Sequence, residues 1–176
     1  MSGIGSRDEL EAFLATRRDS LMRFGYVLTG STAAAEDLTQ DALLAVFKRW
    51  RTINPAGAEA YTRRAMTRLA WRFARTRRET SSLDQVESQS SPQPDHDSTF
   101  DIRTAVRRLP QDKRIIIVLR YWLGYTDAQI PDELGCSIGP VKSRGHRAMA
   151  ELRSHLDIPV SATKVRGADT PSDPRS

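Results

Sequence analysis

The side chains best suited to chemistry are arginines and aromatic rings that occur together in one predicted helix. Between Tyr61 and Arg78 the chain carries seven arginines and no acidic residue, with Trp71 and Phe73 among them. Guanidinium groups neutralise phosphates, and an exposed aromatic face can stack on an unpaired base. The segment is therefore a candidate for binding single-stranded nucleic acid. We expect Phe73 to pack in the core, whereas Trp71 is left open between packing and stacking.

A second basic cluster follows a predicted turn near the other end of the chain. The segment TDAQIPDELGCSIGPVKSRGHRAMAELR places a short helix, a turn with Gly135 and a second helix at the spacing of a helix-turn-helix. Ile130, Leu134 and Val141 would form its internal core. The second helix would present side chains that can bond phosphates or guanine edges, namely Lys142, Ser143, Arg144 and Arg147. The alternative is a solvated face on an ordinary helical hairpin.

Three residues depart from an ideal helix-turn-helix. Pro131 falls inside the first helix, where it removes a backbone hydrogen bond, so we expect a kink or a late helix start. Pro140 is tolerated because it lies in the first turn after Ser137, where amide hydrogens have no intrahelical acceptor. Gly145 lies inside the second helix and is expected to cost about 1 kcal/mol relative to alanine.

Composition argues against several other classes of protein. Of the 176 residues, 39% are hydrophobic and 28% charged, as in soluble proteins, and the net charge of +5 suggests a polyanionic partner. No apolar run approaches the roughly 20 residues of a spanning helix, and Met1 to Asp8 lacks a secretory pattern, so we expect a cytoplasmic protein without membrane insertion. The single cysteine, Cys136, and three scattered histidines offer no metal-ligand spacing. Since no catalytic motif is recognisable either, we expect no metal, no cofactor and no enzymatic activity.

Helical periodicity accounts for the first part of the chain. Ser6 and Glu9 have the spacing of a capping box for a helix that ends at Gly30. Ser31 can cap a second helix running to about Trp50. A third helix is expected over 58–78. Its packing stripe would consist of Tyr61, Ala65, Leu69 and Phe73.

The composition then changes for about 20 residues before helical periodicity resumes. Residues 79–100 contain six serines, two prolines, five acids and no Lys or Arg, which is typical of a flexible linker. Further helices are expected over 101–157; Tyr121 and Trp122 would pack in the core or between domains, and Thr126 would cap the first helix of the pair. The predicted fold class is all-α, with two small helical domains, 1–78 and 101–157, joined by a flexible acidic linker, the second domain containing the helix-turn-helix. Residues 158–176 are a predicted disordered tail.

Four segments of the sequence resemble a known family. DLTQDALLAVFKRW, YTRRAMTRLAWRFARTRR, LPQDKRIIIVLRYWLGYTDAQI and LGCSIGPVKSR occur in the order found in ECF (extracytoplasmic function) sigma factors of the sigma-70 family. The chain is similar to these factors over about residues 8 to 157, and most similar to their actinobacterial, SigE-like branch. The resemblance implies a factor that binds core RNA polymerase and directs promoter recognition, melting and transcription initiation. It implies sigma region 2 over 1–78 and sigma region 4 over 101–157.

The resemblance also implies a role for each cluster. The second helix would dock on the coiled coil of the polymerase beta-prime subunit, through acidic and amide groups beside apolar surface, and the implied residues are Asp37, Gln40 and Asp41. The third helix would read and hold open the −10 element, and the implied residues are Arg63, Arg64, Arg68, Trp71, Arg72 and Arg75. The second domain would bind the beta flap and the −35 element, the latter through Lys142, Ser143, Arg144 and Arg147.

Two other functions fit parts of the sequence. A dimeric helix-turn-helix regulator would bind an operator without polymerase, whereas the family resemblance implies a monomer when free. A degenerate sigma-like adaptor would bind polymerase without reading DNA, and Pro131, Gly145 and Arg68 keep this alternative open. An anti-sigma protein is a further partner that the resemblance implies.

Overall fold

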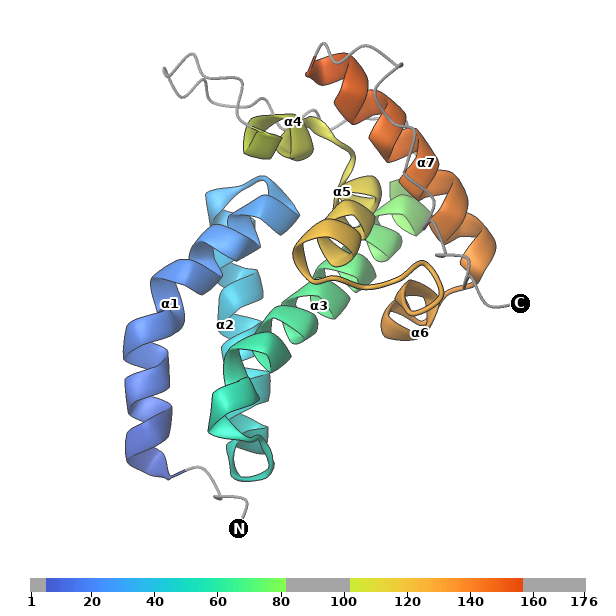
Figure 1. The fold of residues 1–176 in the computed structure, drawn as a ribbon. Helices are drawn as coiled ribbons and strands as arrows, with labels where there is room; N and C mark the ends of the chain where they lie inside the picture. Colours follow the sequence, from blue (N-terminus) through green and yellow to red (C-terminus); the bar gives the residue numbers. More distant parts are fainter. Residues whose placement is uncertain (1–5, 82–101, 157–176) are drawn as a thin grey trace, which may run out of the picture.

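The first part of the protein is a bundle of three long helices. The computed structural model describes residues 6–81 and 102–156, and every regular element within these two ranges is helical, as predicted (Figure 1). The elements of the first range are α1 (Arg7–Thr29), α2 (Thr32–Arg49), the short 3-10 turns η1 (Trp50–Thr52) and η2 (Pro55–Gly57), and α3 (Ala58–Ser81). Helix α3 continues three residues past the predicted end at Arg78. The rest of the predicted linker and the predicted tail lie outside the described residues.

Local capping chemistry fixes where α1 and α2 begin. The backbone N–H of Glu9 donates to the Ser6 hydroxyl oxygen at 3.2 Å, and the Ser6 N–H donates to the Glu9 carboxylate at 2.7 Å, which completes the predicted capping box. Gly30 ends α1 with φ +77°, a left-handed conformation that glycine adopts without strain. Ser31 then caps α2 by accepting a hydrogen bond from Ala34 N–H.

The apolar faces of α1 and α2 pack against each other. Leu21, Phe24 and Leu28 of α1 are buried against Leu38 and Ala42 of α2 in one hydrophobic cluster. The indole N–H of Trp50 reaches back to donate to the Ser6 carbonyl oxygen at 2.8 Å. This long-range bond ties the end of α2 to the start of α1.

The packing face of α3 differs from the predicted stripe. Tyr61, Ala65 and Leu69 are half-buried at its flanks, and Phe73 is 48% exposed, so the expectation that Phe73 packs in the core is wrong. The hydroxyl of Thr62 donates to the Ala58 carbonyl of its own helix at 2.7 Å, which lets a polar residue face the core at little cost. The buried positions are Ala58, Thr62, Met66, Thr67, Ala70 and Trp71.

The second part of the chain packs directly on α3. Its elements are α4 (Ile102–Arg108), α5 (Gln111–Ile117), the π-helical turn η3 (Val118–Trp122), α6 (Ile130–Leu134) and α7 (Ile138–His155). Helix α5 lies between α3 and α7 (Figure 1). The cluster that holds Phe24 and Met66 also contains Ile116, Leu119 and Ile130. The two predicted domains therefore share one apolar core.

Candidate nucleic-acid interface

Helices α6 and α7 form the predicted helix-turn-helix. Gly135 separates them with φ +62°, and Ile130, Leu134 and Val141 are buried as expected. Helix α6 begins at Ile130, so the expected late start is confirmed: Pro131 falls in the first turn, where its missing N–H has no intrahelical acceptor. The expectation that Thr126 caps this helix is wrong, because the helix begins at Ile130 and its N-cap residue is Gln129.

Helix α7 has one buried and one basic face. Val141 and Ala148 are buried, while Lys142, Ser143 and Arg147 are exposed. Arg144 is different, because its Nε lies 3.0 Å from Asp112 Oδ2 and its side chain is only 24% exposed. Three of the four predicted −35 residues thus face solvent, and the fourth is held by α5.

Gly145 has a packing role that its sequence position does not reveal. A Cβ atom there would lie 2.7 Å from Nη2 of Arg120, whose guanidinium also pairs with Asp127. The loss of helix stability expected for this glycine is therefore offset, because the absence of a side chain lets η3 approach α7 closely. Nothing in the local sequence signals this contact, since Arg120 lies 25 positions earlier.

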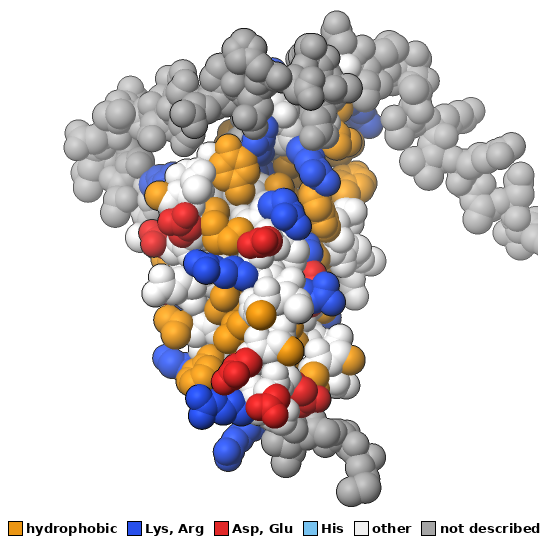
Figure 2. Space-filling view, turned by 90° about the vertical axis from the view of Figure 1, so that its left-hand side faces the viewer, with side chains coloured by type: hydrophobic (Ala, Val, Ile, Leu, Met, Phe, Trp, Pro, Cys, Tyr) orange, Lys and Arg blue, Asp and Glu red, His pale blue; other side chains and the backbone are white. Residues whose placement is uncertain are grey.

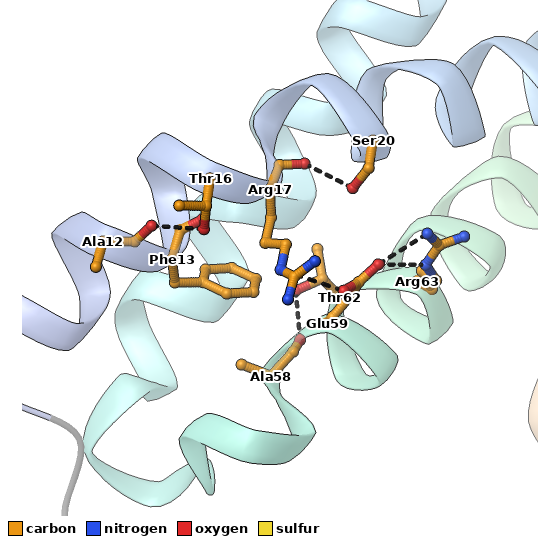
Figure 3. Close-up of polar contacts among 9 residues, drawn as sticks. All are labelled: Ala12, Phe13, Thr16, Arg17, Ser20, Ala58, Glu59, Thr62 and Arg63. Atoms are coloured by element: carbon orange, nitrogen blue, oxygen red, sulfur yellow. Dashed lines mark hydrogen bonds and ion pairs between the residues drawn. The ribbon is translucent and has the colours of Figure 1, made fainter.

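The α3 arginines divide between those engaged inside the first domain and those that face outward. Glu59 accepts from Arg63 at 2.8 Å and lies 3.4 Å from Arg17 of α1, so it joins the two helices (Figure 3). The Arg63 guanidinium also lies 4.9 Å from the centre of the Phe24 ring. Arg64 and Arg72 are exposed. Among the predicted −10 residues, Arg63 is therefore the one that stabilises the packing of α3 against α1.

The remaining predicted −10 residues contact other side chains. Nε of Arg68 donates to Glu133 of α6 at 2.7 Å, and this hydrogen bond raises the pKa of Arg68 above its usual value. Nε of Arg75 donates to Glu79 at 2.8 Å within α3. Trp71 is 7% exposed. The structure therefore places Trp71 in packing, and Arg68 in a contact between the domains.

Helix α2 carries the predicted polymerase-binding residues on an open face. Asp37, Gln40 and Asp41 are all exposed. On the same helix Leu44 and Phe47 are 50% and 62% exposed, although both are large and apolar. They line a groove of about 400 Å³ between α1 and α2. On the side of the molecule where α1 lies, Figure 2 shows hydrophobic side chains exposed among charged side chains of both signs.

Arg114 is a structural residue that the sequence analysis missed. Its side chain is buried, and its Nη2 donates to the carbonyl oxygens of Arg107 and Leu109 at 2.7 and 2.8 Å. Gly30 leaves room for it, because a Cβ there would lie 2.8 Å from Arg114 Nη1. Burial and the nearby charge of Arg107 lower the pKa of Arg114 to about 10.

The two aromatic residues of η3 differ in what they contact. Trp122 packs edge-on against Phe24 of α1 at 6.4 Å between ring centres, so the expected interdomain contact exists. Tyr121 is 62% exposed, so the expectation that it is buried is wrong.

Within 6–81 and 102–156 no cluster of potential metal ligands occurs, and no helix of these ranges is long and apolar enough to span a bilayer.

Comparison with known proteins identifies the class of protein. The family model described as Sigma-70 region 2 matches residues 13–80, and the model described as Sigma-70, region 4 matches residues 99–152. The chain is 34% identical over 158 residues to the RNA polymerase sigma-E factor of Streptomyces coelicolor, covering 84% of this chain and 86% of the relative. It is 35% identical over 145 residues to the ECF RNA polymerase sigma factor SigL of Mycobacterium tuberculosis, covering 77% and 82%.

A solved structure supports the fold. The sigma factor RpoE of Bartonella quintana, determined in complex with the anti-sigma factor NepR, matches with a TM-score of 0.58 at 23% identity, covering 86% of this chain and 98% of that one. The chain belongs to the sigma-70 family and, within it, to the ECF sigma factors. As a member it binds core RNA polymerase and directs transcription initiation at promoters.

Proposed function

We propose that three separate surfaces of this chain divide the work of a sigma factor. The basic face of α7 reads the −35 element in duplex DNA, and the outward face of α3 holds melted −10 DNA. The exposed face of α2 binds the polymerase. The observation that carries this assignment is that α7 and α3 each combine a buried side with an exposed row of basic residues.

For α7 the proposed contacts follow from exposure and chemistry. Lys142 and Arg147 can neutralise phosphates, and Arg147 can also bond the guanine edge in a major groove. For α3 the proposed contacts with phosphates are Arg64 and Arg72, because both are exposed. The polymerase carries out the chemistry of RNA synthesis, so the contribution of this chain is binding energy. Since transcription takes place in the bacterial cytoplasm, this chain acts there.

For α2 the exposed apolar side chains complement the acidic ones. Leu44 and Phe47 can pack on a partner helix, while Asp37 and Asp41 pair with its basic residues. An anti-sigma factor accompanies the sigma factor in the similar solved structure, and we include such an inhibitor among the partners proposed for this chain.

Transcription with purified core polymerase on a library of promoter fragments tests the whole assignment. Phe47→Ser is expected to weaken binding to immobilised core polymerase by about five- to thirtyfold, because truncating an apolar anchor costs about 1–2 kcal/mol. Ile102→Ser is the matched control, since Ile102 is equally exposed at 62% but lies on α4. Equal retention of the two variants would contradict the role of α2.

The DNA-reading role of α7 needs a separate pair of variants. Arg147→Ala is expected to weaken binding of the −35 element by about 1–3 kcal/mol and therefore to lower the transcript yield at selected promoters, with binding to core polymerase unchanged. Arg7→Ala removes an exposed arginine from α1 and should leave the yield unchanged. If the chain binds core polymerase but selects no promoter at all, the proposed function fails.

A further inference from the structure

A cavity of about 620 Å³ lies between α1 of the first domain and the start of the second domain. Its walls come from α1, the start of α2, α3, α4 and the end of η3. None of the described residues proposed above to contact DNA or polymerase lines it. Its volume lies within the range of about 300–1,000 Å³ that is usual for small-molecule sites. The cavity is therefore a candidate binding site separate from the three surfaces already assigned.

The charged side chains in the described lining of this cavity are all arginines, namely Arg23, Arg63, Arg103 and Arg107. Glu59 pairs with Arg63 at 2.8 Å. Arg23 and Arg107 form no ion pair with any residue that the structure describes. The buried Arg114 lies behind the same wall, because its Nη2 donates to the Arg107 carbonyl oxygen at 2.7 Å. Burial and the charge of Arg107 both lower the pKa of Arg114, so positive charge accumulates here and suits a polyanion.

Three aromatic rings line the same cavity, those of Phe24, Tyr26 and Trp122. Phe24 is only 2% exposed, and the Arg107 guanidinium lies 5.1 Å from the centre of the Tyr26 ring. The Trp122 ring meets Phe24 at 6.4 Å between ring centres, yet Trp122 is 47% exposed. Trp122 is therefore the ring with surface available to a ligand. Exposed aromatic rings of this kind stack on nucleobases.

Arginines beside an exposed indole are the groups that a nucleotide requires. Guanidinium groups bind phosphates through forked, charge-assisted hydrogen bonds, and the indole stacks on the base. The size of the cavity suits one nucleotide. A nucleic-acid strand is bound along a continuous basic groove instead, and the exposed arginines Arg64 and Arg72 of α3 do not belong to this cavity.

We propose that this cavity binds a free nucleoside polyphosphate, with its phosphates on Arg23 and Arg107 and its base on Trp122. The site goes beyond the proposed function and does not depend on it, since none of these three residues has a part there. Helix α1 supplies Arg23, while the second domain supplies Arg107 and Trp122. The nucleotide therefore contacts both domains, and its binding stabilises the folded chain.

Isothermal titration calorimetry of the full chain with ATP and with GTP tests the site. EDTA in the buffer keeps the phosphates free of metal ions. Saturable binding at one site per chain, with a Kd below about 1 mM, is expected for at least one of the two nucleotides. The same nucleotide should raise the melting temperature, because it binds the folded chain only. Adenosine and guanosine, which carry no phosphate, should not bind measurably.

Arg23→Glu is expected to weaken nucleotide binding by about tenfold or more, because it removes a charge-assisted hydrogen bond and places a repelling carboxylate in the wall. Arg107→Gln should weaken it by a similar factor. Arg18→Glu is the matched control: Arg18 is exposed on the same helix, its substitution changes the net charge equally, and it does not line this cavity.

Trp122→Ala separates stacking from charge. It should weaken nucleotide binding by about fivefold or more, since base stacking on an aromatic side chain is worth at least that factor. Binding of inorganic tripolyphosphate, which has no base, should be unchanged in this variant. Equal loss of both ligands in folded Trp122→Ala would overturn the proposed stacking.

The proposal as a whole is overturned if neither ATP nor GTP binds the wild-type chain, or if Arg23→Glu and Arg18→Glu weaken binding equally. It is also overturned if a single-stranded oligonucleotide of about ten nucleotides binds through Arg23 and Trp122 while the free nucleotides do not, because the site would then hold a strand. If a variant loses its helical circular dichroism, the remaining variants decide.

Discussion

Arg114 offers the sharpest test of how the two domains hold together. It is a buried cation with four backbone carbonyl oxygens around it, two from each domain. Nη2 donates to those of Arg107 and Leu109 at 2.7 and 2.8 Å, and Nη1 lies 3.5 Å from those of Val27 and Leu28 at the end of α1. We expect Arg114→Met to destabilise the fold, because methionine fills the aliphatic volume but leaves these oxygens without a donor.

The magnitude follows from two opposing contributions. Two short hydrogen bonds from a charged donor contribute about 1.5–3 kcal/mol each. Burial lowers the pKa of Arg114 to about 10. A lowering of that size means that the charge costs about 3 kcal/mol at neutral pH, and methionine avoids this cost. At the middle of their range the two bonds contribute about 4.5 kcal/mol and outweigh the desolvation by about 1.5 kcal/mol, so the free energy of unfolding should fall by about that amount.

Arg114→Lys separates the charge from the forked geometry. Lysine retains a buried charge but cannot reach several carbonyls at once, so we expect it to destabilise more than methionine does. Urea unfolding at neutral pH, followed by helical circular dichroism, measures both. Arg7→Met is the control and should lie within about 0.5 kcal/mol of wild type, since Arg7 is exposed. A lysine variant as stable as wild type, or a methionine variant indistinguishable from the control, would refute this reasoning.

Three further predictions concern packing and titration. Gly25→Ala should lower the melting temperature, because the added methyl group would lie 3.1–3.2 Å from three neighbouring atoms. Overpacking costs about 1–3 kcal/mol, which outweighs the gain of about 1 kcal/mol in helix propensity from glycine to alanine. A raised melting temperature would contradict this prediction. Trp50→Phe should remove about 1 kcal/mol through loss of the bond to Ser6 and speed amide exchange in the first turns of α1, whereas unchanged exchange would show that the tether is unimportant. Burial raises the pKa of the Cys136 thiol and outweighs the opposing effect of the nearby arginines. The thiolate is the form that reacts with alkylating reagents. The alkylation rate should therefore increase with pH, and the midpoint of that increase should lie at a higher pH than for a cysteine in a short peptide. A midpoint at or below the peptide value would count against this burial.

Local features of the fold could be predicted because they depend on neighbours a few positions away. Ser6 and Glu9 satisfy each other's backbone, and Gly30 and Gly135 adopt left-handed conformations that end helices. The late start of α6 follows from the ring of Pro131. The helix-turn-helix and the basic rows were visible for the same reason, since helical period places them on a face without reference to any partner.

The buried face of α3 is less accessible from the sequence. Periodicity predicted one packing stripe, which ends at Phe73, and this stripe is not the buried face of the helix. The choice went to Thr62, Met66 and Ala70, because threonine can satisfy its hydroxyl within the helix and small residues permit close approach to α1 and α2. Such a choice depends on the shape of the opposing helices.

The amino-acid sequence by itself determined where most helices begin and end and which family the chain resembles. Tertiary structure alone decided that the two domains share a core, that Arg114 is buried between them, and that Glu133 and Asp112 hold Arg68 and Arg78. The physical reason is range: caps and periodicity act within one or two helical turns. The partner of a surface charge is chosen by packing that brings together residues 34 or 65 positions apart.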